Sequence, residues 1–361
     1  MIPYQFSRER KDFLNVLRQR VNDYFTEEKI SRNANVFMVL KTIMAITLFV
    51  GPFVLILALG KELHWFILYA LWFVMACGKA FIGTSVMHDS LHGSYSSNQQ
   101  VNKVIGWCTY LIGVNPKMWQ IQHNVIHHTF TNIHDVDEDL DAHYVLRFTP
   151  NQDRRWFHRY QHIYVWLFYC LPVILWSSIK DFKKLKLYKK KGFIKSGGEF
   201  NKYLVIITVQ KLVYFSVFVG VPYYYLGWSL GVIIPMFLFM EAVTGLFLSF
   251  IFQTAHVMPD NKFLNQEDHL IKENWAEHQL LTTTNYGRKN KVLCWFSGGL
   301  NFQIEHHLFP NICHIHYPKI AKIVKATAKE YDLPYFEFRT FRQAVGAHYG
   351  QLKALGRADF R

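Results

Sequence analysis

Three groups of histidines in this chain have the spacing expected of metal ligands. They read HDSLH, HNVIHH and QIEHH. In a helix, residues four apart lie on one face about a turn apart, so HxxxH presents two imidazoles to a single ion, and an adjacent histidine supplies a further ligand. The candidate ligands in these groups are His88, His92, His123, His127, His128, His306 and His307.

The number of candidate ligands bears on the identity of the metal. One histidine pair alone could be an ordinary polar pair, but three such groups in one chain favour a metal site. His256, in the segment FQTAHV, is the best candidate for an eighth ligand; the alternative is that it caps its helix or faces lipid headgroups. A zinc ion uses about three or four protein ligands, whereas two iron ions would use all of these imidazoles. The count therefore favours a di-iron centre.

The remaining histidines lack this pattern, and we expect them at the surface or in a supporting role. They are His64, His134, His143, His158, His162, His269, His278, His314, His316 and His348.

An acidic run follows the second histidine group. It contains Asp135, Asp137, Glu138, Asp139 and Asp141. The simpler interpretation is a solvated loop. However, metal-bound histidines generally donate their other ring nitrogen to a carboxylate or carbonyl, and this run is the nearest source. Asp137 and Asp139 are therefore candidate acceptors for metal-bound imidazoles.

Gln303 opens the third histidine group. An amide is a poorer iron ligand than a neutral imidazole, because its oxygen is a weak donor and its nitrogen has no available lone pair. Two roles remain open: weak binding of one iron through the carbonyl oxygen, or holding a metal-bound water or a neighbouring imidazole. We favour the second role.

The sequence between these groups has the pattern of a membrane protein. The whole chain is 51% hydrophobic and 17% aromatic, and its apolar residues gather into long runs with the charges between them. Four runs come near the ~20 residues that a helix needs to cross the hydrocarbon of a bilayer. They are Val36–Leu59, Leu63–Val86, Tyr203–Val221 and Gly231–Gln253.

These runs predict an all-α, multi-pass integral membrane protein, with four transmembrane helices in two hairpins and a cytoplasmic helical cap that holds the di-iron site. Basic residues lie mostly outside the short connectors, so the positive-inside rule places both termini and the active site in the cytoplasm. We expect one domain over residues 1–361, divided into an N-terminal segment (1–35), a first hairpin (36–86), a cap with two histidine groups (87–202), a second hairpin (203–253) and a C-terminal part with the third group (254–361).

Two further features lie within apolar sequence. Tyr164–Ile179 is short and contains Pro172; if it crossed the membrane, the histidines before it and after it would lie on opposite sides. We therefore expect an interfacial or buried helix. Lys211 and Glu241 fall at comparable depth on the second hairpin, which suggests a pair, but a snorkelling lysine and a cavity-lining glutamate are equally compatible.

The charge of the chain limits its partners. Its formal net charge is +14. A nucleic-acid-binding domain does not carry apolar runs of spanning length between its basic patches, so we expect no nucleic acid. Anionic membrane lipids or an acidic protein fit better. A basic cluster suits an acidic electron carrier and headgroup contact equally well, and it comprises Lys183, Lys184, Lys186, Lys189, Lys190 and Lys191.

At these residues the sequence resembles the membrane fatty acid desaturases. Their signature is three histidine boxes, HxxxH, HxxxHH and [H/Q]xxHH. The likeness runs from about Val36 to Tyr335 and includes HHTFTNIHDVDEDLD and GGLNFQIEHHLFP. A glutamine at the start of the last box is similar to the branch that contains front-end and linoleoyl-type enzymes. The front-end enzymes of eukaryotes often carry a cytochrome b5 domain with an HPGG motif, which this sequence lacks.

The resemblance implies a fatty acyl desaturase. His88, His92, His123, His127, His128, His256, His306 and His307 would ligate two iron ions, with dioxygen as co-substrate. The substrate would be an acyl-CoA or an acyl-lipid, and the electrons would come from a separate donor of the ferredoxin or cytochrome b5 type.

Two other functions remain open at this point. A hydroxylase or ketolase of the same di-iron superfamily would use the same ligands but leave oxygen in the lipid. A non-catalytic membrane metal or haem protein, such as a transporter, would need polar groups along its spans, whereas here the histidines cluster in the predicted cytoplasmic segments. The bond position, the headgroup of the substrate and the electron donor are not predicted by the sequence.

Overall fold

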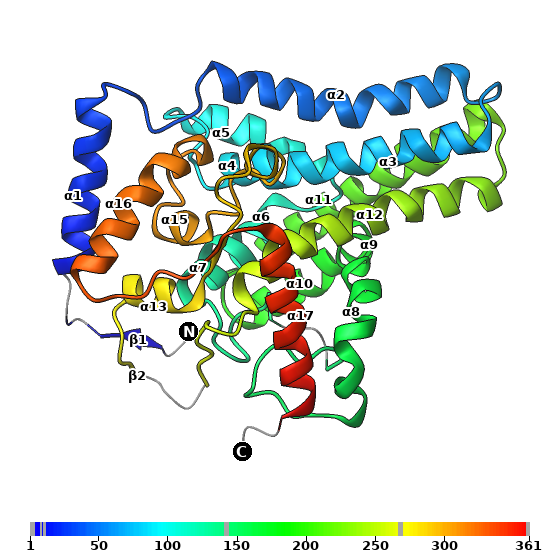
Figure 1. Ribbon diagram of the computed structural model, residues 1–361. Coiled ribbons are helices and arrows are strands. Elements are labelled where there is room, and N and C mark those ends of the chain that lie inside the picture. The colour runs from blue at the N-terminus through cyan, green and yellow to red at the C-terminus, as the bar shows by residue number, and fades with distance from the viewer. Residues whose placement is uncertain (1–3, 8, 10–11, 141–143, 266–269, 359–361) are drawn as a thin grey trace.

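Four long apolar helices dominate the computed structural model (Figure 1). The structure describes the whole chain except residues 1–3, 8, 10–11, 141–143, 266–269 and 359–361. The helices long and apolar enough to cross a membrane are Val36–Leu59, Trp65–Leu91, Gly197–Leu226 and Leu230–His256. The four runs predicted from the sequence are therefore confirmed as helices. Three of them extend beyond the apolar run, because helical hydrogen bonding continues into polar sequence that the rest of the protein holds in place.

These four candidate spans form an elongated bundle. The first is α2 (Val36–Leu59), and the second comprises α3 (Trp65–Phe81), η1 (Ile82–Met87) and α4 (His88–Leu91). The third comprises α11 (Gly197–Phe215), η6 (Ser216–Gly220) and η7 (Pro222–Leu226), and the fourth is α12 (Leu230–His256). Large buried side chains fill the space between them, among them Phe49, Trp72, Met75, Phe218 and Met240. The outer faces are apolar and exposed, as membrane-spanning helices require.

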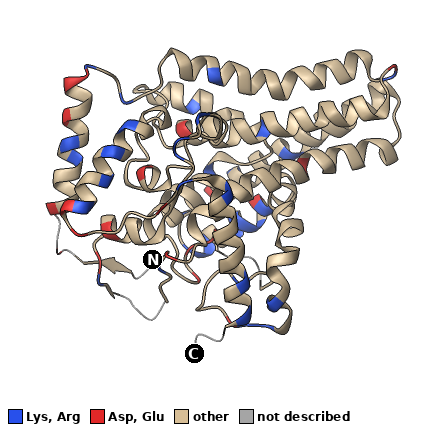
Figure 2. Ribbon diagram, viewed as in Figure 1, with Lys and Arg blue, Asp and Glu red and all other residues tan. Residues whose placement is uncertain are grey.

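The remaining helices form a compact head at one end of the bundle (Figure 1). In chain order they are α1 (Asp12–Glu27), α5 (Gln99–Gly106), η2 (Trp107–Tyr110), α6 (Pro116–Gln120), η3 (Ile121–His127), α7 (His128–Phe130), η4 (Trp156–Tyr160), α8 (Gln161–Tyr169), α9 (Leu171–Leu175), η5 (Trp176–Lys180), α10 (Asp181–Lys190), α13 (Trp275–Thr282), α14 (Lys291–Phe296), α15 (Gln303–Leu308), η8 (His314–His316), α16 (Tyr317–Glu330) and α17 (Phe341–Arg357). Figure 2 shows that most charged residues lie on this head and few on the bundle.

Two short parallel strand pairs tie distant parts of the head together. Strand β1 (Gln5–Phe6) pairs with β2 (Leu270–Ile271), with Gln5 opposite Leu270. Strand β3 (Asn285–Tyr286) pairs with β4 (Glu337–Phe338), with Asn285 opposite Glu337.

The stretch predicted to be interfacial is a bent helix pair. Trp156–Tyr169 and Leu171–Lys190 meet at an angle of 52°, which is compatible with a broken span or a re-entrant segment. Pro172 lies in the first turn after the break, where its missing N–H costs no helical hydrogen bond. The bend packs against α12 at Gly245, where an added Cβ would lie 2.7 Å from the carbonyl oxygen of Cys170. Glycine is therefore required for this approach.

The suggested pair of Lys211 with Glu241 is wrong. The Lys211 ammonium lies 2.5 Å from a carboxylate oxygen of Asp181. Glu241 instead lies 2.5 Å from the ammonium of Lys79 and accepts a hydrogen bond from Tyr214 at 2.6 Å. Both pairs are buried, where a lone charge would cost several kcal/mol. The similar depth of Lys211 and Glu241 along the predicted hairpin did not reveal their partners, which come from α10 and α3.

Candidate metal centre

The structure brings all eight candidate ligands together in the head. His88 and His92 lie where the second span ends, and His256 is the last residue of α12. The second group lies on η3 and the start of α7, and the third lies on α15. All of these side chains are buried except His92, which is half-buried.

The imidazoles form two adjoining groups. In the first, ring nitrogens of His88, His92, His123 and His306 all lie within 4.8 Å of one another, and in the second, those of His127, His256 and His307 do so. His128 lies between the groups, with its ring centroid 4.7 Å from that of His92 and 4.4 Å from that of His307. The ring nitrogens of His128, His306 and His307 form a third set that overlaps both groups, so the cluster is compatible with two neighbouring metal ions.

A π-helical turn distributes the second histidine group between these two positions. We expected an α-helix here, but His128 donates its backbone N–H to the carbonyl of His123, five residues earlier. This wider turn brings the Nε2 atoms of His123 and His128 to 3.2 Å, while His127 turns toward His256 and His307. Such single-turn π segments are frequent at functional sites. The spacing of histidines alone does not reveal the change of helix type.

Consecutive residues divide the third group in the same way. His306 and His307 lie on α15, where neighbouring residues point about 100° apart. The ring of His306 therefore lies 4.4 Å from that of His88, and the ring of His307 lies 5.0 Å from that of His256.

Acceptors hold the outer ring nitrogens of His127 and His307. His127 Nδ1 lies 3.1 Å from each carboxylate oxygen of Asp137. The backbone N–H of Asn132 donates a hydrogen bond to the same carboxylate at 2.9 Å and fixes its position. His307 Nδ1 lies 2.8 Å from the amide oxygen of Gln279. These bonds direct the Nε2 atoms toward the centre and fix the ring orientations.

Other acceptors are longer or shared. Asp139 lies 3.5 Å from His127 Nδ1 and 3.9 Å from His123 Nδ1, and it also accepts a hydrogen bond from Gln122. His306 Nδ1 lies 3.3 Å from the hydroxyl of Tyr317. Asp141 lies outside the described residues.

The protonation states suit metal binding for most of the cluster. Burial lowers the pKa of His123 to about 3 and lowers the pKa values of His128, His306 and His307 well below the ordinary range. Those imidazoles are therefore neutral, the form that coordinates metal. His127 differs: burial lowers its pKa, but the carboxylates of Asp137 and Asp139 outweigh this and raise it to about 9.

The inward nitrogens fit a metal. Among the described residues, the buried Nε2 atoms of His92, His256, His306 and His307 have no hydrogen-bond partner. Buried polar atoms nearly always have a partner, and a set of facing imidazole nitrogens can be satisfied together by cations. An all-imidazole donor set suits iron, zinc, copper or nickel. The ligand chemistry is therefore compatible with iron without excluding the others.

Several supporting residues were missed at the level of sequence. Asp89 accepts hydrogen bonds from His314 Nδ1 at 2.8 Å and from Cys313 Sγ at 3.0 Å, and His314 Nε2 lies 2.7 Å from the Lys41 ammonium. This buried chain fixes the segment that carries His88. The only feature of the sequence that pointed to this supporting role was the position of Asp89 inside the HDSLH motif.

Gln303 is buried in the first turn of α15, one turn before the histidine pair. Its Nε2 atom has no partner among the residues that the structure describes. Its side chain is therefore free to hold a further group near the site.

An apolar cavity of about 770 Å³ reaches the cluster at His123, His127 and His256. One part of its wall comes from the bent helix pair and α12 and contains Phe168, Val173, Trp176, Leu248 and Phe252.

Four lysines also line this cavity, namely Lys180, Lys183, Lys184 and Lys191. Glu138 pairs with Lys184 and with Lys191, the latter at 2.9 Å. The basic cluster predicted from the sequence is therefore partly neutralised.

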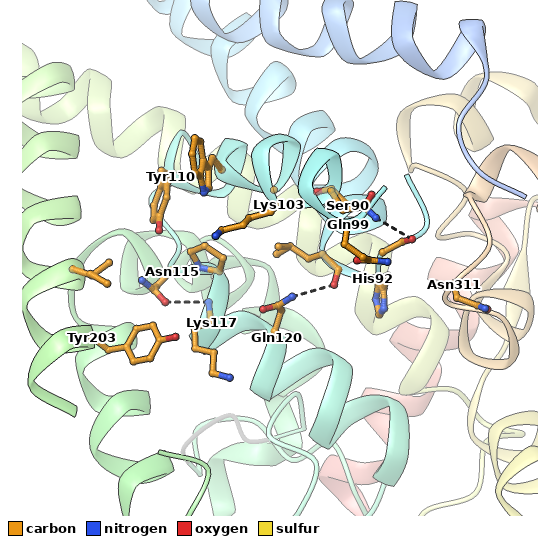
Figure 3. A pocket seen from close by; sticks show the side chains of 17 residues that line it. Ser90, His92, Gln99, Lys103, Tyr110, Asn115, Lys117, Gln120, Tyr203 and Asn311 are labelled. Atoms are coloured by element: carbon orange, nitrogen blue, oxygen red, sulfur yellow. Dashed lines mark hydrogen bonds between the residues drawn. The ribbon is translucent and has the colours of Figure 1, made fainter. Parts of the chain in front are cut away.

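A second cavity, of about 600 Å³, meets the cluster at His92 (Figure 3). Its lining is mainly polar, with the side chains of Gln99, Lys103, Lys117 and Gln120 among others. Gln120 donates a hydrogen bond to the carbonyl of Leu91 at 3.2 Å and so holds the chain beside His92.

Comparison with known proteins identifies the relatives of this chain. Residues 63–339 match the family model described as fatty acid desaturase. The chain is 36% identical over 358 residues to an acyl-lipid (8-3)-desaturase of Physcomitrium patens, covering 98% of this chain and 73% of that protein. It is 32% identical over 358 residues to an sn-1 linoleoyl-lipid 6-desaturase of Synechocystis sp., covering 97% of each. A protein of the same name from Arthrospira platensis is 34% identical over 359 residues, covering 95% of this chain and 92% of that protein.

The contact of Asp137 with His127 gives a direct test of the site. Asp137→Asn removes the carboxylate that orients this imidazole, so we expect metal affinity to fall by about 10 to 100-fold. Asp135→Asn is the matched control, because the Asp135 side chain is 64% exposed. Metal retained after dialysis against graded chelator concentrations measures the difference. Equal retention in the two variants would contradict the role of Asp137.

Proposed function

Because this chain belongs to the fatty acid desaturase family and is a fatty acyl desaturase, we propose that its two imidazole groups hold a pair of iron ions beside a cavity for an acyl chain. The observation that carries this proposal is the meeting of inward-facing imidazole nitrogens with the wall of an apolar cavity. The two features together bring a methylene chain to a metal site.

The proposed ligands are His88, His92, His123, His127, His128, His256, His306 and His307. When bound, iron would supply the oxidation in which dioxygen takes two hydrogens from adjacent methylenes and, with two further electrons and two protons, leaves as two waters. The side chains around the ligands contribute orientation. Asp137, Asp139 and Gln279 hold imidazole rings in place, and Gln303 is proposed to hold a water or a neighbouring imidazole.

The larger cavity is proposed to bind the acyl chain. Its volume of about 770 Å³ lies within the usual range for ligand pockets. The chain would lie along the wall formed by Phe168, Trp176 and Phe252, with its polar end at the lysines. An ordered apolar cavity excludes water and fixes which methylenes lie beside the imidazoles. Since the named relatives are acyl-lipid and linoleoyl-lipid desaturases, we propose an acyl-lipid as the substrate in preference to an acyl-CoA.

The chain is a membrane protein, and we propose two transmembrane hairpins with both termini and the active site in the cytoplasm. Tyr164–Ile179 is then a re-entrant or interfacial segment that does not cross. The histidines before and after this segment lie in one cluster, which supports a single-sided arrangement. In this proposal residues 1–361 form one domain.

Electrons are proposed to come from a separate donor of the ferredoxin or cytochrome b5 type. The net charge of +14 supports an acidic donor, because opposite charges speed association.

Lipid analysis tests the proposed reaction. Expression in a host that lacks the activity should produce acyl chains with one additional double bond, measured by gas chromatography with mass spectrometry of lipid-derived methyl esters. The acyl-lipid proposal further predicts that the new double bond accumulates first in glycerolipids and not in acyl-CoA. Host lipids that gain a hydroxyl or keto group instead, or that remain unchanged with iron-loaded protein present, would contradict the proposal.

The wall of the proposed acyl cavity predicts chain-length selectivity. Leu248 lines the cavity and packs with Val173 and with Ala80 of α3. Leu248→Trp should shorten the cavity and so favour acyl chains that are shorter by one or two methylenes. The ratio of products from shorter and longer chains should rise by about 10 to 200-fold at most for each methylene. Leu238 lies on the exposed face of the same helix, so Leu238→Trp serves as the control. An unchanged ratio of products in Leu248→Trp would mean that the acyl chain does not bind along this wall.

A further inference from the structure

The smaller cavity is separate from the acyl cavity. It is bounded by α5, η2, α6 and α11, and Leu91, His92 and Asn311 also line it. Among the described residues, none lines both cavities. A molecule in the smaller cavity therefore reaches the histidine cluster from its own side, and the two cavities can be filled at the same time.

The walls of this cavity carry positive charge. Lys103 and Lys117 both line it, and no described lining residue is an aspartate or glutamate. Figure 3 shows the two lysines on either side of the space, with Tyr110 and Tyr203 along one flank. Neither lysine ammonium has a hydrogen bond or an ion pair to another described residue. Two cations without counter-ions, next to hydroxyl donors, form a site for an anion with several oxygens, such as a phosphate.

The rim of the cavity is suited to a membrane surface. On the outer side of α5 and η2, the apolar residues Val101, Val104 and Trp107 are exposed by 40%, 53% and 52%. On the other side, Tyr203 and Ile206 belong to the candidate span Gly197–Leu226. Tryptophan and tyrosine beside apolar side chains are typical of the depth at which lipid headgroups lie. A soluble anion would gain nothing from this apolar rim.

We propose that the smaller cavity binds the phosphate of an anionic glycerophospholipid headgroup. Lys103 and Lys117 provide the opposite charge, Tyr110 and Tyr203 donate hydrogen bonds, and the lipid tails lie against the exposed apolar face of α5 and η2. This site is distinct from the substrate site, and its lipid is a partner of the enzyme. The proposal does not depend on the reaction at the imidazole cluster, because binding can be measured without turnover.

Titration of the purified protein with a short-chain lipid tests this site. Dioctanoyl phosphatidylglycerol should bind and raise the unfolding temperature, whereas dioctanoyl phosphatidylcholine, which has no net charge, and inorganic phosphate should bind at least tenfold more weakly. The double variant Lys103→Gln/Lys117→Gln should lose about tenfold or more in affinity for phosphatidylglycerol, as expected for removing charge-assisted hydrogen bonds. Isothermal titration calorimetry in detergent gives the affinities.

The matched control is Lys186→Gln/Lys190→Gln. These lysines are exposed on α10 and line neither cavity, and the control removes the same net charge. It should keep the affinity of the unaltered protein. Tyr203→Phe offers a milder variant with an expected loss of severalfold, should the double variant fold poorly. Equal loss in the control, equal affinity for the two lipids, or equal affinity for inorganic phosphate would each overturn the proposal.

Discussion

The gathering of eight imidazoles in one cluster, seven of them buried, is the constraint on which the rest of the structure depends. The ligands come from the ends of two spans and from two short helical segments, and the first and last of them are more than two hundred residues apart in the sequence. Removing these polar rings from water is unfavourable unless each nitrogen finds a partner. The outer nitrogens of His127, His307 and His306 find a carboxylate, an amide and a hydroxyl, and the inner nitrogens face each other across the positions that we propose for metal. The spans and the head must therefore pack in one arrangement for the site to exist.

Buried charge pairs reinforce that arrangement. Lys79 on α3 and Glu241 on α12 join two spans, and Lys211 on α11 joins Asp181 at the start of α10. Such pairs contribute little net stability compared with apolar residues, but breaking one leaves a buried charge uncompensated and costs about 3 to 5 kcal/mol. They therefore penalise other packings of the bundle more than they stabilise this one. The Lys211 pair also holds Asp181, which lies within the bent helix pair that lines the larger cavity.

The sequence predicted the features that depend on residue type and on spacing along the chain. Apolar length located the four long helices, histidine spacing selected seven of the residues that lie together, and the position of His256 in FQTAHV selected the eighth. The features that it missed depend on rotation about helix axes and on contacts between distant segments. The sequence placed Lys211 and Glu241 at a similar depth in the membrane. Their actual partners, Asp181 on α10 and Lys79 on α3, depend on how distant helices pack. The π-helical turn at His123 leaves the histidine spacing unchanged, and Asp89 meets His314 across 225 positions of sequence.

The central claim is that two adjoining groups of imidazoles hold two iron ions. Elemental analysis of active, detergent-purified protein, normalised to chain concentration, tests it most directly. The account predicts about two irons per chain, because the eight imidazoles form two positions and not one. One zinc per chain with no iron in active protein would contradict it.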